Sequence, residues 1–380
     1  MKVGIPKEIV SGETRVAVVP ETVKRLTGAG MEVVLETGAG AASSIADGEF
    51  VKAGATIAGS AKEVFGSSDL ILKIQPLLIG EGGTADEVAA LKEGAALITF
   101  LQPFKNRKML ERLAARRIRA MGMELVPRIT RAQNMDALSS MATVAGYKAV
   151  LLAANAFTRF FPMFMTAAGT IPPARALILG AGVAGLQAIA TAKRLGAAVE
   201  AFDTRPVVKE QVESLGAKFI VMEVAHEEAQ DAGGYAKQLS EEHHKKELAL
   251  IESHLARTDI LITTAQIPGK KSPVLITRDM AKKLKPGSVV VDLAVEGGGN
   301  CELSELNKTV VKDGVTYIGV TNLPALMPTH ASQMYSKNIG NLVLHLWKDK
   351  TLKFDLEDPI TSGVLATWEG KIVHPALKQG

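Results

Sequence analysis

The sequence predicts an α/β protein with two doubly wound Rossmann-like domains joined by long interdomain helices. Three observations lead to this fold class. Strand-like apolar runs alternate with helical patterns in both halves of the chain, which is typical of parallel sheets covered on both faces. A glycine-rich run lies near the middle of the chain, at residues 180–185. The length of 380 residues also exceeds the size at which one hydrophobic core usually stops growing.

The first half of the chain contains strand-like runs separated by helical patterns. The strands are predicted at residues 2–5, 32–36, 70–74, 96–101 and 118–123. The helical patterns lie at residues 21–26, 85–91 and 108–115. This alternation predicts that the first domain is built around a parallel sheet.

The second half repeats the alternation from residue 174 onwards. Its strands are predicted at residues 174–179, 197–202, 218–221, 260–264, 288–293 and 317–320. A helix is predicted at residues 183–195, directly after the glycine-rich run, and Gly196 closes it. Strands in this number and order are typical of a complete Rossmann domain.

Two long helical segments are expected to cross between the domains. They lie at residues 137–157 and 331–347, and both carry small and apolar residues at helical spacing. The tail, residues 352–380, is then expected to return to the first domain as two short strands. The predicted domains are a first α/β domain of residues 1–140 with 328–380, and a Rossmann domain of residues 141–327.

The glycine-rich run matches the turn of an α/β unit that binds a dinucleotide. Gly180 permits the tight turn, Gly182 lets phosphates touch the backbone, and Gly185 allows close helix–strand packing. Val183 starts the helix whose N-terminus faces the anion. The alternative is that the glycines serve an ordinary strand–helix turn.

An acidic residue follows the second strand of this unit. Asp203 lies about 20 residues after the glycines, where a carboxylate binds ribose hydroxyls. A carboxylate there repels a 2′-phosphate, so the sequence favours NAD over NADP. Thr204 and Arg205, which come next, leave NADP selection open.

A polar segment at residues 128–140 separates two apolar elements. Polar groups beside a core need partners. Gln133 offers a donor and an acceptor in one plane, as a nicotinamide carboxamide does, so it is a candidate to orient that ring. Arg128 and Asp136 are candidates to pair with each other, or Asp136 to accept from the amide. The alternative is structural, with Asp136 as a helix cap and the Arg–Asp pair on the surface.

A long charged segment at residues 225–256 exceeds the minimal Rossmann pattern. It is interrupted by Gly233, Gly234 and Tyr235, which are typical either of a hinged flap or of a plain surface loop. Both interpretations remain open.

Composition narrows the class of protein. A formal net charge of +4, without a basic stripe, does not indicate nucleic-acid binding. Cys301 is the single cysteine, which fits a reducing compartment. The apolar stretch at residues 149–171 is broken by Arg159 and Pro162, so we expect a buried helix and loop there and no membrane span. The cytoplasm is the expected location.

The sequence offers little for catalysis beyond positioning a cofactor. All seven histidines lie after residue 225, so the N-terminal half has no imidazole to accept a proton. No spacing of ligands indicates a metal site, and no motif indicates a nucleophile. Arg15 and Lys73 are the cations placed to meet a carboxylate substrate, although such residues more often form salt bridges.

Several motifs together resemble a known family. They are residues 5–8 (IPKE), 12–17 (GETRVA), 128–140, 165–170 (MTAAGT), 231–237, 292–296 (DLAVE) and 298–300 (GGN). Together they resemble the NAD(H)-binding components of proton-translocating nicotinamide nucleotide transhydrogenases, in the alanine dehydrogenase/transhydrogenase family. The resemblance covers nearly the whole chain, and the segment with Arg128, Gln133 and Asp136 is its most specific portion.

The resemblance implies roles for individual residues. The residues implied to hold the nicotinamide end of the cofactor are Arg128, Gln133, Asp136 and Ser139. The remaining cofactor residues are implied to be Gly180, Gly182, Val183, Gly185, Asp203, Thr204, Arg205, Gly234, Tyr235 and Gln266. Tyr235 would close a mobile loop, and Gln266 stands where some relatives have an apolar residue.

The resemblance also implies partners. Hydride would pass between NAD(H) on this chain and NADP(H) on a separate component, coupled to proton movement through a membrane-spanning component. The chain is then peripherally attached to the membrane, and the family suggests a homodimer. Because the chain ends at Gly380 without apolar spans, we expect the membrane component on a separate polypeptide, or on the missing remainder of a longer subunit.

Two other functions are weighed against this one. An alanine dehydrogenase-like, NAD-dependent amino-acid dehydrogenase is the first, because Arg15 and Lys73 match that family's substrate-binding cations. That family's histidine is replaced by Gln102, and its aspartate by Glu296, so deprotonating an amino acid is difficult here. The second is a catalytically silent nucleotide-binding or regulatory protein.

Overall fold

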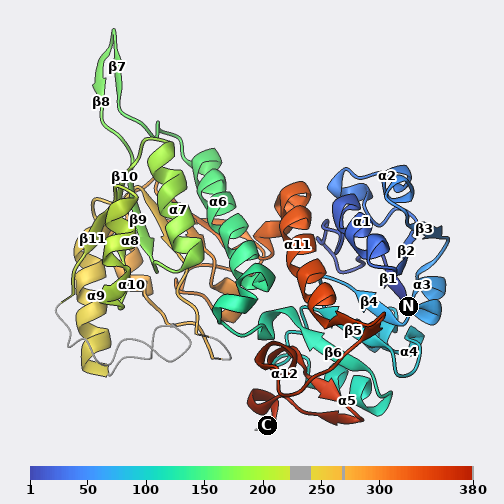
Figure 1. Ribbon diagram of the computed structural model, residues 1–380. Coiled ribbons are helices and arrows are strands. Elements are labelled where there is room, and N and C mark those ends of the chain that lie inside the picture. The colour runs from blue at the N-terminus through green and yellow to red at the C-terminus, as the bar shows by residue number, and fades with distance from the viewer. Residues whose placement is uncertain (223–240, 268–269, 379–380) are drawn as a thin grey trace. The chain divides into compact units, whose positions relative to one another are not determined.

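The computed structural model describes residues 1–222, 241–267 and 270–378, and it divides into two units (Figure 1). The first unit comprises Met1–Met141 and Pro324–Gly380, and the second comprises Ala142–Leu323. The sequence-based domain limits at residues 140 and 328 remain a prediction about the functional domains.

Within the described residues, the first unit is built around a six-stranded parallel sheet. In sheet order its strands are β3 (Thr56–Ala58), β2 (Glu32–Glu36), β1 (Lys2–Ile5), β4 (Leu70–Leu72), β5 (Ala96–Thr99) and β6 (Arg119–Gly122). The strand order reverses beside β1, as in a Rossmann sheet. Strand β3 was not predicted from the sequence, because its three residues are too few to show an alternation of apolar and polar side chains. Thr56, the first of them, is exposed.

The helices of the first unit connect these parallel strands. They are α1 (Pro20–Gly28), α2 (Asp47–Lys52), α3 (Ala61–Ser67), α4 (Glu87–Ala90) and α5 (Arg107–Ala115). The sequence predicted α1, α4 and α5, but it missed the short helices α2 and α3. Leu110 and Leu113 of α5 are fully buried and pack with Leu97 of β5 in one apolar cluster. Each buried leucine contributes about 1.5–3 kcal/mol relative to exposure.

The C-terminal segment of the chain belongs to the first unit. It contains α11 (Pro328–Leu346), α12 (Pro359–Val364), and the short hairpins β16 (Trp347–Lys348) with β17 (Thr351–Leu352) and β18 (Thr367–Trp368) with β19 (Lys371–Ile372). The hydroxyl of Thr367 donates to the carbonyl of Ile118 at 2.7 Å, so the tail lies beside β6. The helix α11 lies in the first unit, which the chain re-enters at Pro324. That residues 331–347 cross between the functional domains stays a prediction.

Small residues let α11 pack closely on α1. A Cβ atom at Gly340 would lie 2.7 Å from Cγ2 of Thr22, so the two helices approach more closely than a side chain at position 340 allows. Ser336 lies one turn earlier, and its hydroxyl donates to the hydroxyl of Thr22 at 2.7 Å. This face of α11 is therefore fixed against α1.

The second unit is built around a seven-stranded sheet in the described residues. In sheet order its strands are β11 (Lys218–Ile220), β10 (Ala198–Phe202), β9 (Arg175–Leu179), β12 (Ile260–Thr263), β13 (Val289–Asp292), β15 (Val315–Ile318) and β14 (Thr309–Lys312). The six predicted strands are confirmed, and every pairing between two of them is parallel. The seventh strand, β14, pairs antiparallel with β15 across the turn at Asp313 and Gly314. The fold class of two doubly wound parallel sheets is thus confirmed.

The helices of the second unit accompany this sheet. They are α7 (Val183–Arg194), α8 (Lys209–Ser214), α9 (Glu241–Leu255) and α10 (Arg278–Ala281), together with most of α6 (Ala137–Ala156). Close packing of α6 on α7 requires a glycine, because a Cβ at Gly146 would lie 2.1 Å from the carbonyl oxygen of Ala184. Among the described residues, α6 is the one helix long and apolar enough to cross a membrane by length and composition, a test that core helices of soluble proteins also pass.

The apolar stretch at residues 149–171 differs from its predicted form. Its helical segment ends at Ala156, and a hairpin of β7 (Phe164–Thr166) and β8 (Gly169–Ile171) follows (Figure 1). The hairpin is exposed, and Met165 is 81% accessible to solvent. The prediction of a buried loop was therefore wrong here, because hydrophobic side chains alone do not show which face a short hairpin presents.

Candidate nucleotide-binding site

The glycine-rich turn lies at the carboxyl edge of the second sheet, between β9 and α7. Gly180 has a φ of +96°, a left-handed conformation that favours glycine. A Cβ there would also lie 2.5 Å from Oγ1 of Thr264. Because β10 and β12 flank β9 on opposite sides, the turn lies where the strand order reverses, the usual position of a ligand crevice in such sheets.

The other two glycines of the turn differ in how much space surrounds them. Gly182 precedes the first residue of α7, and a Cβ placed on it meets no atom within 4 Å. A Cβ on Gly185 would lie 1.8 Å from the carbonyl oxygen of Gly180. Gly182 therefore leaves space beside the helix N-terminus, whereas Gly185 lets the helix pack on the turn. Val183, the first helical residue, is 40% exposed at this end of α7.

Asp203 follows β10 and contacts the glycine-rich turn directly. Its Oδ2 accepts from the N–H of Ala181 at 2.7 Å and from Nη2 of Arg205 at 2.8 Å. Its Oδ1 accepts from the N–H and the Nε of Arg205, at 2.8 and 2.9 Å. Thr204 lies between the two charged residues, and its buried Oγ1 has no hydrogen-bond partner among the described residues. Asp203 is 9% exposed, so Arg205 covers the group proposed to bind ribose.

Gln266 lies in the loop after β12, at the same edge of the sheet. Its Nε2 donates to the carbonyl oxygen of Leu293 at 2.9 Å, and the residue is exposed. Asn300 holds the neighbouring residue Ala265, donating to its carbonyl at 2.9 Å and accepting from its N–H at 3.0 Å. Ala265 and Gln266 are therefore held at the same edge of the sheet as the glycine-rich turn. The predicted contacts of Gly234 and Tyr235 lie outside the described residues.

The polar segment at residues 128–140 lies in the first unit and leads into α6. Asp136 accepts from the N–H of Ser139 at 2.9 Å through Oδ1, and from its hydroxyl at 2.6 Å through Oδ2. This is the helix-capping role that the sequence left open for Asp136, and it brings Asp136 and Ser139 together. Gln133 is exposed on the 3₁₀ turn at Thr130–Met135, and Arg128 is exposed just before that turn.

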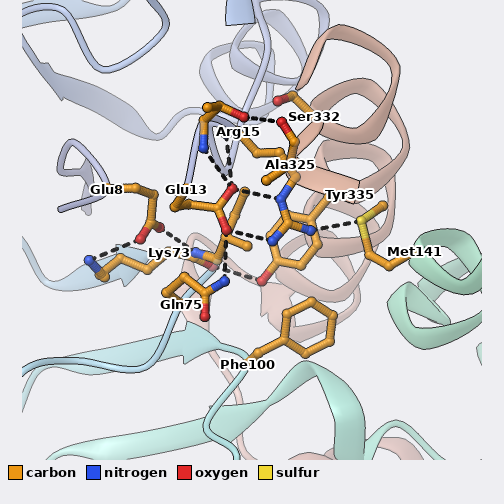
Figure 2. Close-up of polar contacts among 12 residues, drawn as sticks. Glu8, Glu13, Arg15, Lys73, Gln75, Phe100, Met141, Ala325, Ser332 and Tyr335 are labelled. Atoms are coloured by element: carbon orange, nitrogen blue, oxygen red, sulfur yellow. Dashed lines mark hydrogen bonds and ion pairs between the residues drawn. The ribbon is translucent and has the colours of Figure 1, made fainter. Parts of the chain in front are cut away.

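The two cations considered for a carboxylate substrate are buried in the first unit (Figure 2). Arg15 forms a bidentate pair with Glu13, with Nε to Oε1 at 2.7 Å and Nη2 to Oε2 at 2.6 Å. Burial raises the pKa of Glu13, but hydrogen bonds and charge from Arg15 outweigh it and lower the pKa to about 2. Gln75 also donates to Glu13, at 2.7 Å. Glu13 is therefore ionised at neutral pH.

Lys73 is held by two carboxylates. Its Nζ lies 2.8 Å from Glu87 and 3.3 Å from Glu8, and the lysine is fully buried. Burial lowers the pKa of Lys73, but Glu8 and Glu87 outweigh it and raise the pKa above its ordinary value. Burial raises the pKa of Glu8, against the opposing effect of Lys73. Sequence reasoning missed Glu87 as a partner, because nothing in the spacing links it to Lys73.

Two family models match the chain. The model described as "Alanine dehydrogenase/PNT, N-terminal domain" matches residues 4–145, and the C-terminal domain model matches residues 149–375. Among solved structures, "The crystal structure of transhydrogenase from Sinorhizobium meliloti" superimposes with a TM-score of 0.87 and 43% identity, over 98% of this chain and 100% of that one. A structure of "L-alanine dehydrogenase" has a TM-score of 0.83 and 27% identity, over 100% of this chain and 98% of that one.

Curated relatives extend the comparison. The first part of the "NAD(P) transhydrogenase subunit alpha" of Rhodospirillum rubrum is 55% identical, over 99% of this chain and 99% of that one. The "NAD(P) transhydrogenase subunit alpha" of Haemophilus influenzae is 44% identical over all of this chain and 73% of that one. An "Alanine dehydrogenase" of Methanococcus maripaludis is 28% identical over 99% of this chain and 95% of that one.

The chain belongs to the alanine dehydrogenase/PNT family, whose two domain models together match nearly its whole length. Within that family it belongs with the NAD(P) transhydrogenase alpha subunits, as the full-length identity of 55% shows. The resemblance predicted from the sequence motifs is thereby confirmed.

Proposed function

We propose that this chain is the NAD(H)-binding component of a proton-translocating NAD(P) transhydrogenase. In this role it transfers hydride directly between its own NAD(H) and NADP(H) on a partner component. The observation that carries the proposal is the glycine-rich turn with Asp203, where Gly182 leaves open space at the N-terminus of α7. A pyrophosphate suits that end of a helix, because the N–H groups and the helix dipole both favour an anion. The similarity to transhydrogenase alpha subunits supports the same function.

In this proposal each residue of the site has its own role in holding the cofactor. NAD(H), when bound, supplies or accepts the hydride, so the chain's role is mainly position. Gly180, Gly182 and Gly185 make the turn that receives the pyrophosphate, and Asp203 holds the adenosine ribose. Arg205 donates three hydrogen bonds to the Asp203 carboxylate. Some of these hydrogen bonds therefore have to break before the ribose hydroxyls can bind to Asp203.

The nicotinamide end is assigned to the segment that starts α6. Gln133 would orient the carboxamide, with Arg128 as a further contact. Asp136 and Ser139 hold the helix start that follows Gln133, through their two hydrogen bonds. The partners in this proposal are an NADP(H)-binding component, a membrane-spanning proton-channel component and a second copy of this chain, with the assembly attached to the membrane from the cytoplasm.

An amino-acid dehydrogenase is the competing function, because L-alanine dehydrogenase shares the fold. The structure gives it less support. Arg15 and Lys73 are 4% and 0% exposed, and both are paired with the chain's own carboxylates. Gln102 and Glu296 stand where that family has its histidine and aspartate.

Mixing experiments separate the two functions. The chain, loaded with NADH and mixed with a purified NADP(H)-binding component, should show rapid redox exchange between the two bound nucleotides. The same chain alone should neither reduce pyruvate with NADH and ammonia nor oxidise alanine with NAD. Robust pyruvate reduction by the chain alone would establish the dehydrogenase instead.

Replacing Asp203 by alanine should weaken NADH binding by about 1–3 kcal/mol, because a charged hydrogen bond to ribose is lost. The substitution also frees Arg205, so we expect the preference for NADH over NADPH to shrink. Equilibrium titration with both nucleotides measures the effect. Asp279→Ala, which removes an exposed carboxylate from the same unit, is the matched control and should leave both affinities unchanged. Unaltered NADH affinity in Asp203→Ala would place Asp203 outside the site.

A further inference from the structure

Two side-chain amides of α11 converge on one backbone carbonyl next to Gln133. Nδ2 of Asn338 donates to the carbonyl oxygen of Asn134 at 3.0 Å, and Nδ2 of Asn341 donates to the same oxygen at 2.9 Å. The two asparagines are three residues apart, so they lie on the same face of the helix. Both lone pairs of this carbonyl are therefore engaged by α11.

The turn that carries Gln133 is also held by its apolar side chains. Ala132 and Met135, which flank Gln133 and Asn134, are 0% and 5% exposed, while Gln133 itself is exposed. The backbone is thus anchored on both sides of the exposed glutamine. The direction in which the Gln133 side chain leaves the protein is set by this anchored turn.

The amides are themselves fixed by the rest of the first unit. Asn338 is 7% exposed, in the interface of α11 with the turn. Asn341 accepts a hydrogen bond from Nη2 of Arg25 on α1 at 2.8 Å. The contacts therefore run from α1 through α11 to the backbone at Asn134.

A neighbouring ion pair does not replace these amides. Arg131 lies 3.3 Å from Asp358, but the arginine side chain is 64% exposed. Exposed pairs contribute about 0–1 kcal/mol. The two amides therefore hold the turn in addition to this ion pair.

We propose that Asn338 and Asn341 are positioning residues that fix Gln133 for hydride transfer. This inference rests on the proposed function, in which Gln133 orients the nicotinamide. Both amide nitrogens donate to the backbone carbonyl of Asn134, so they act on Gln133 through the geometry of the turn. A displacement of about 1 Å at a reacting group can reduce a rate on the order of a hundredfold.

The variant Asn341→Asp tests the inference with the least disturbance. It is isosteric, it keeps an acceptor for Arg25, and it replaces the donor to Asn134 with an oxygen that repels the carbonyl. With the NADP(H)-binding component added, hydride exchange at saturating NADH should slow by about tenfold. The dissociation constant for NADH should stay within about twofold of the parent, because the pyrophosphate and ribose contacts are untouched.

The matched control is Ser336→Ala on the same helix. It removes the hydrogen bond to the hydroxyl of Thr22 and the one from the N–H of Val19 but leaves the amides in place, so hydride exchange should stay at the parent rate. A second measurement needs no catalysis: amide hydrogen exchange at residues 130–136 should rise in Asn341→Asp and stay at the parent level in Ser336→Ala.

Each outcome decides between the inference and the function beneath it. An unchanged hydride-exchange rate in Asn341→Asp, or a rate that falls only in proportion to NADH affinity, would overturn the positioning role. Absence of exchange in the parent chain with its partner component would overturn the proposed function, and with it the catalytic purpose of the two amides. In that case the amide hydrogen exchange would still show whether they hold the turn.

Discussion

Replacing Lys73 by methionine should lower the free energy of unfolding by about 3–5 kcal/mol, because it leaves buried carboxylates without their cation. Glu8 and Glu87 are both nearly inaccessible and contact this one lysine. Without Lys73, one or both have to take up a proton or remain as uncompensated buried charges. Urea unfolding followed by circular dichroism measures the loss in the transition of the first unit.

Lys92→Met is the matched control for this effect. It breaks the pair with Asp69, whose side chains are 51% and 41% exposed, so it should cost less than about 1 kcal/mol. Adding Glu87→Gln to Lys73→Met should restore some of the loss, because it removes one of the uncompensated charges. Equal, small losses in Lys73→Met and Lys92→Met would show that the buried ion pairs contribute no more than exposed ones.

Replacing Gln133 by asparagine should slow hydride exchange about a hundredfold while NADH binding changes little. The shorter side chain withdraws the amide by about one carbon–carbon bond, so the nicotinamide ring is misplaced while the adenosine end stays held. Stopped-flow measurement of exchange with the NADP(H)-binding component gives the rate, and titration gives the NADH affinity.

Arg131→Gln is the control on the same turn. Its exposed pair with Asp358 contributes little, so the variant should exchange hydride near the parent rate. A Gln133→Asn variant that exchanges hydride as fast as the parent would remove Gln133 from the mechanism. A parallel loss of NADH affinity would mean that Gln133 contributes to binding and not to positioning.

Local sequence patterns predicted most of the fold, but short edge elements escaped them. The strand β14 is half-exposed and four residues long, and its only strong signal is the Asp313-Gly314 pair that turns into β15. Both turn residues have positive φ, at 51° and 75°, as a tight hairpin requires. That dipeptide was the signal available in the sequence. For β3 the three residues offered no comparable signal.

The candidate site was predictable only where its chemistry is local. The glycine-rich turn and Asp203 belong to one β–α–β unit, so their spacing along the chain already determines their proximity. Arg205 lies two residues from Asp203, yet nothing in the spacing showed that it would donate three hydrogen bonds to that carboxylate. Whether an adjacent arginine points to the carboxylate or to solvent depends on the packing around it.

The sequence by itself determined the two parallel sheets, the turn between β9 and α7, and membership in the alanine dehydrogenase/PNT family. These follow from periodicity and from backbone conformations that only particular residues adopt, such as glycine at position 180. Only the tertiary structure decided which buried charges have an opposite charge beside them. It also decided that α11 holds the turn at Thr130–Met135. Lys73 and Glu8, or Asn134 and Asn338, meet because strands and helices distant along the chain pack together, and no local rule encodes that meeting.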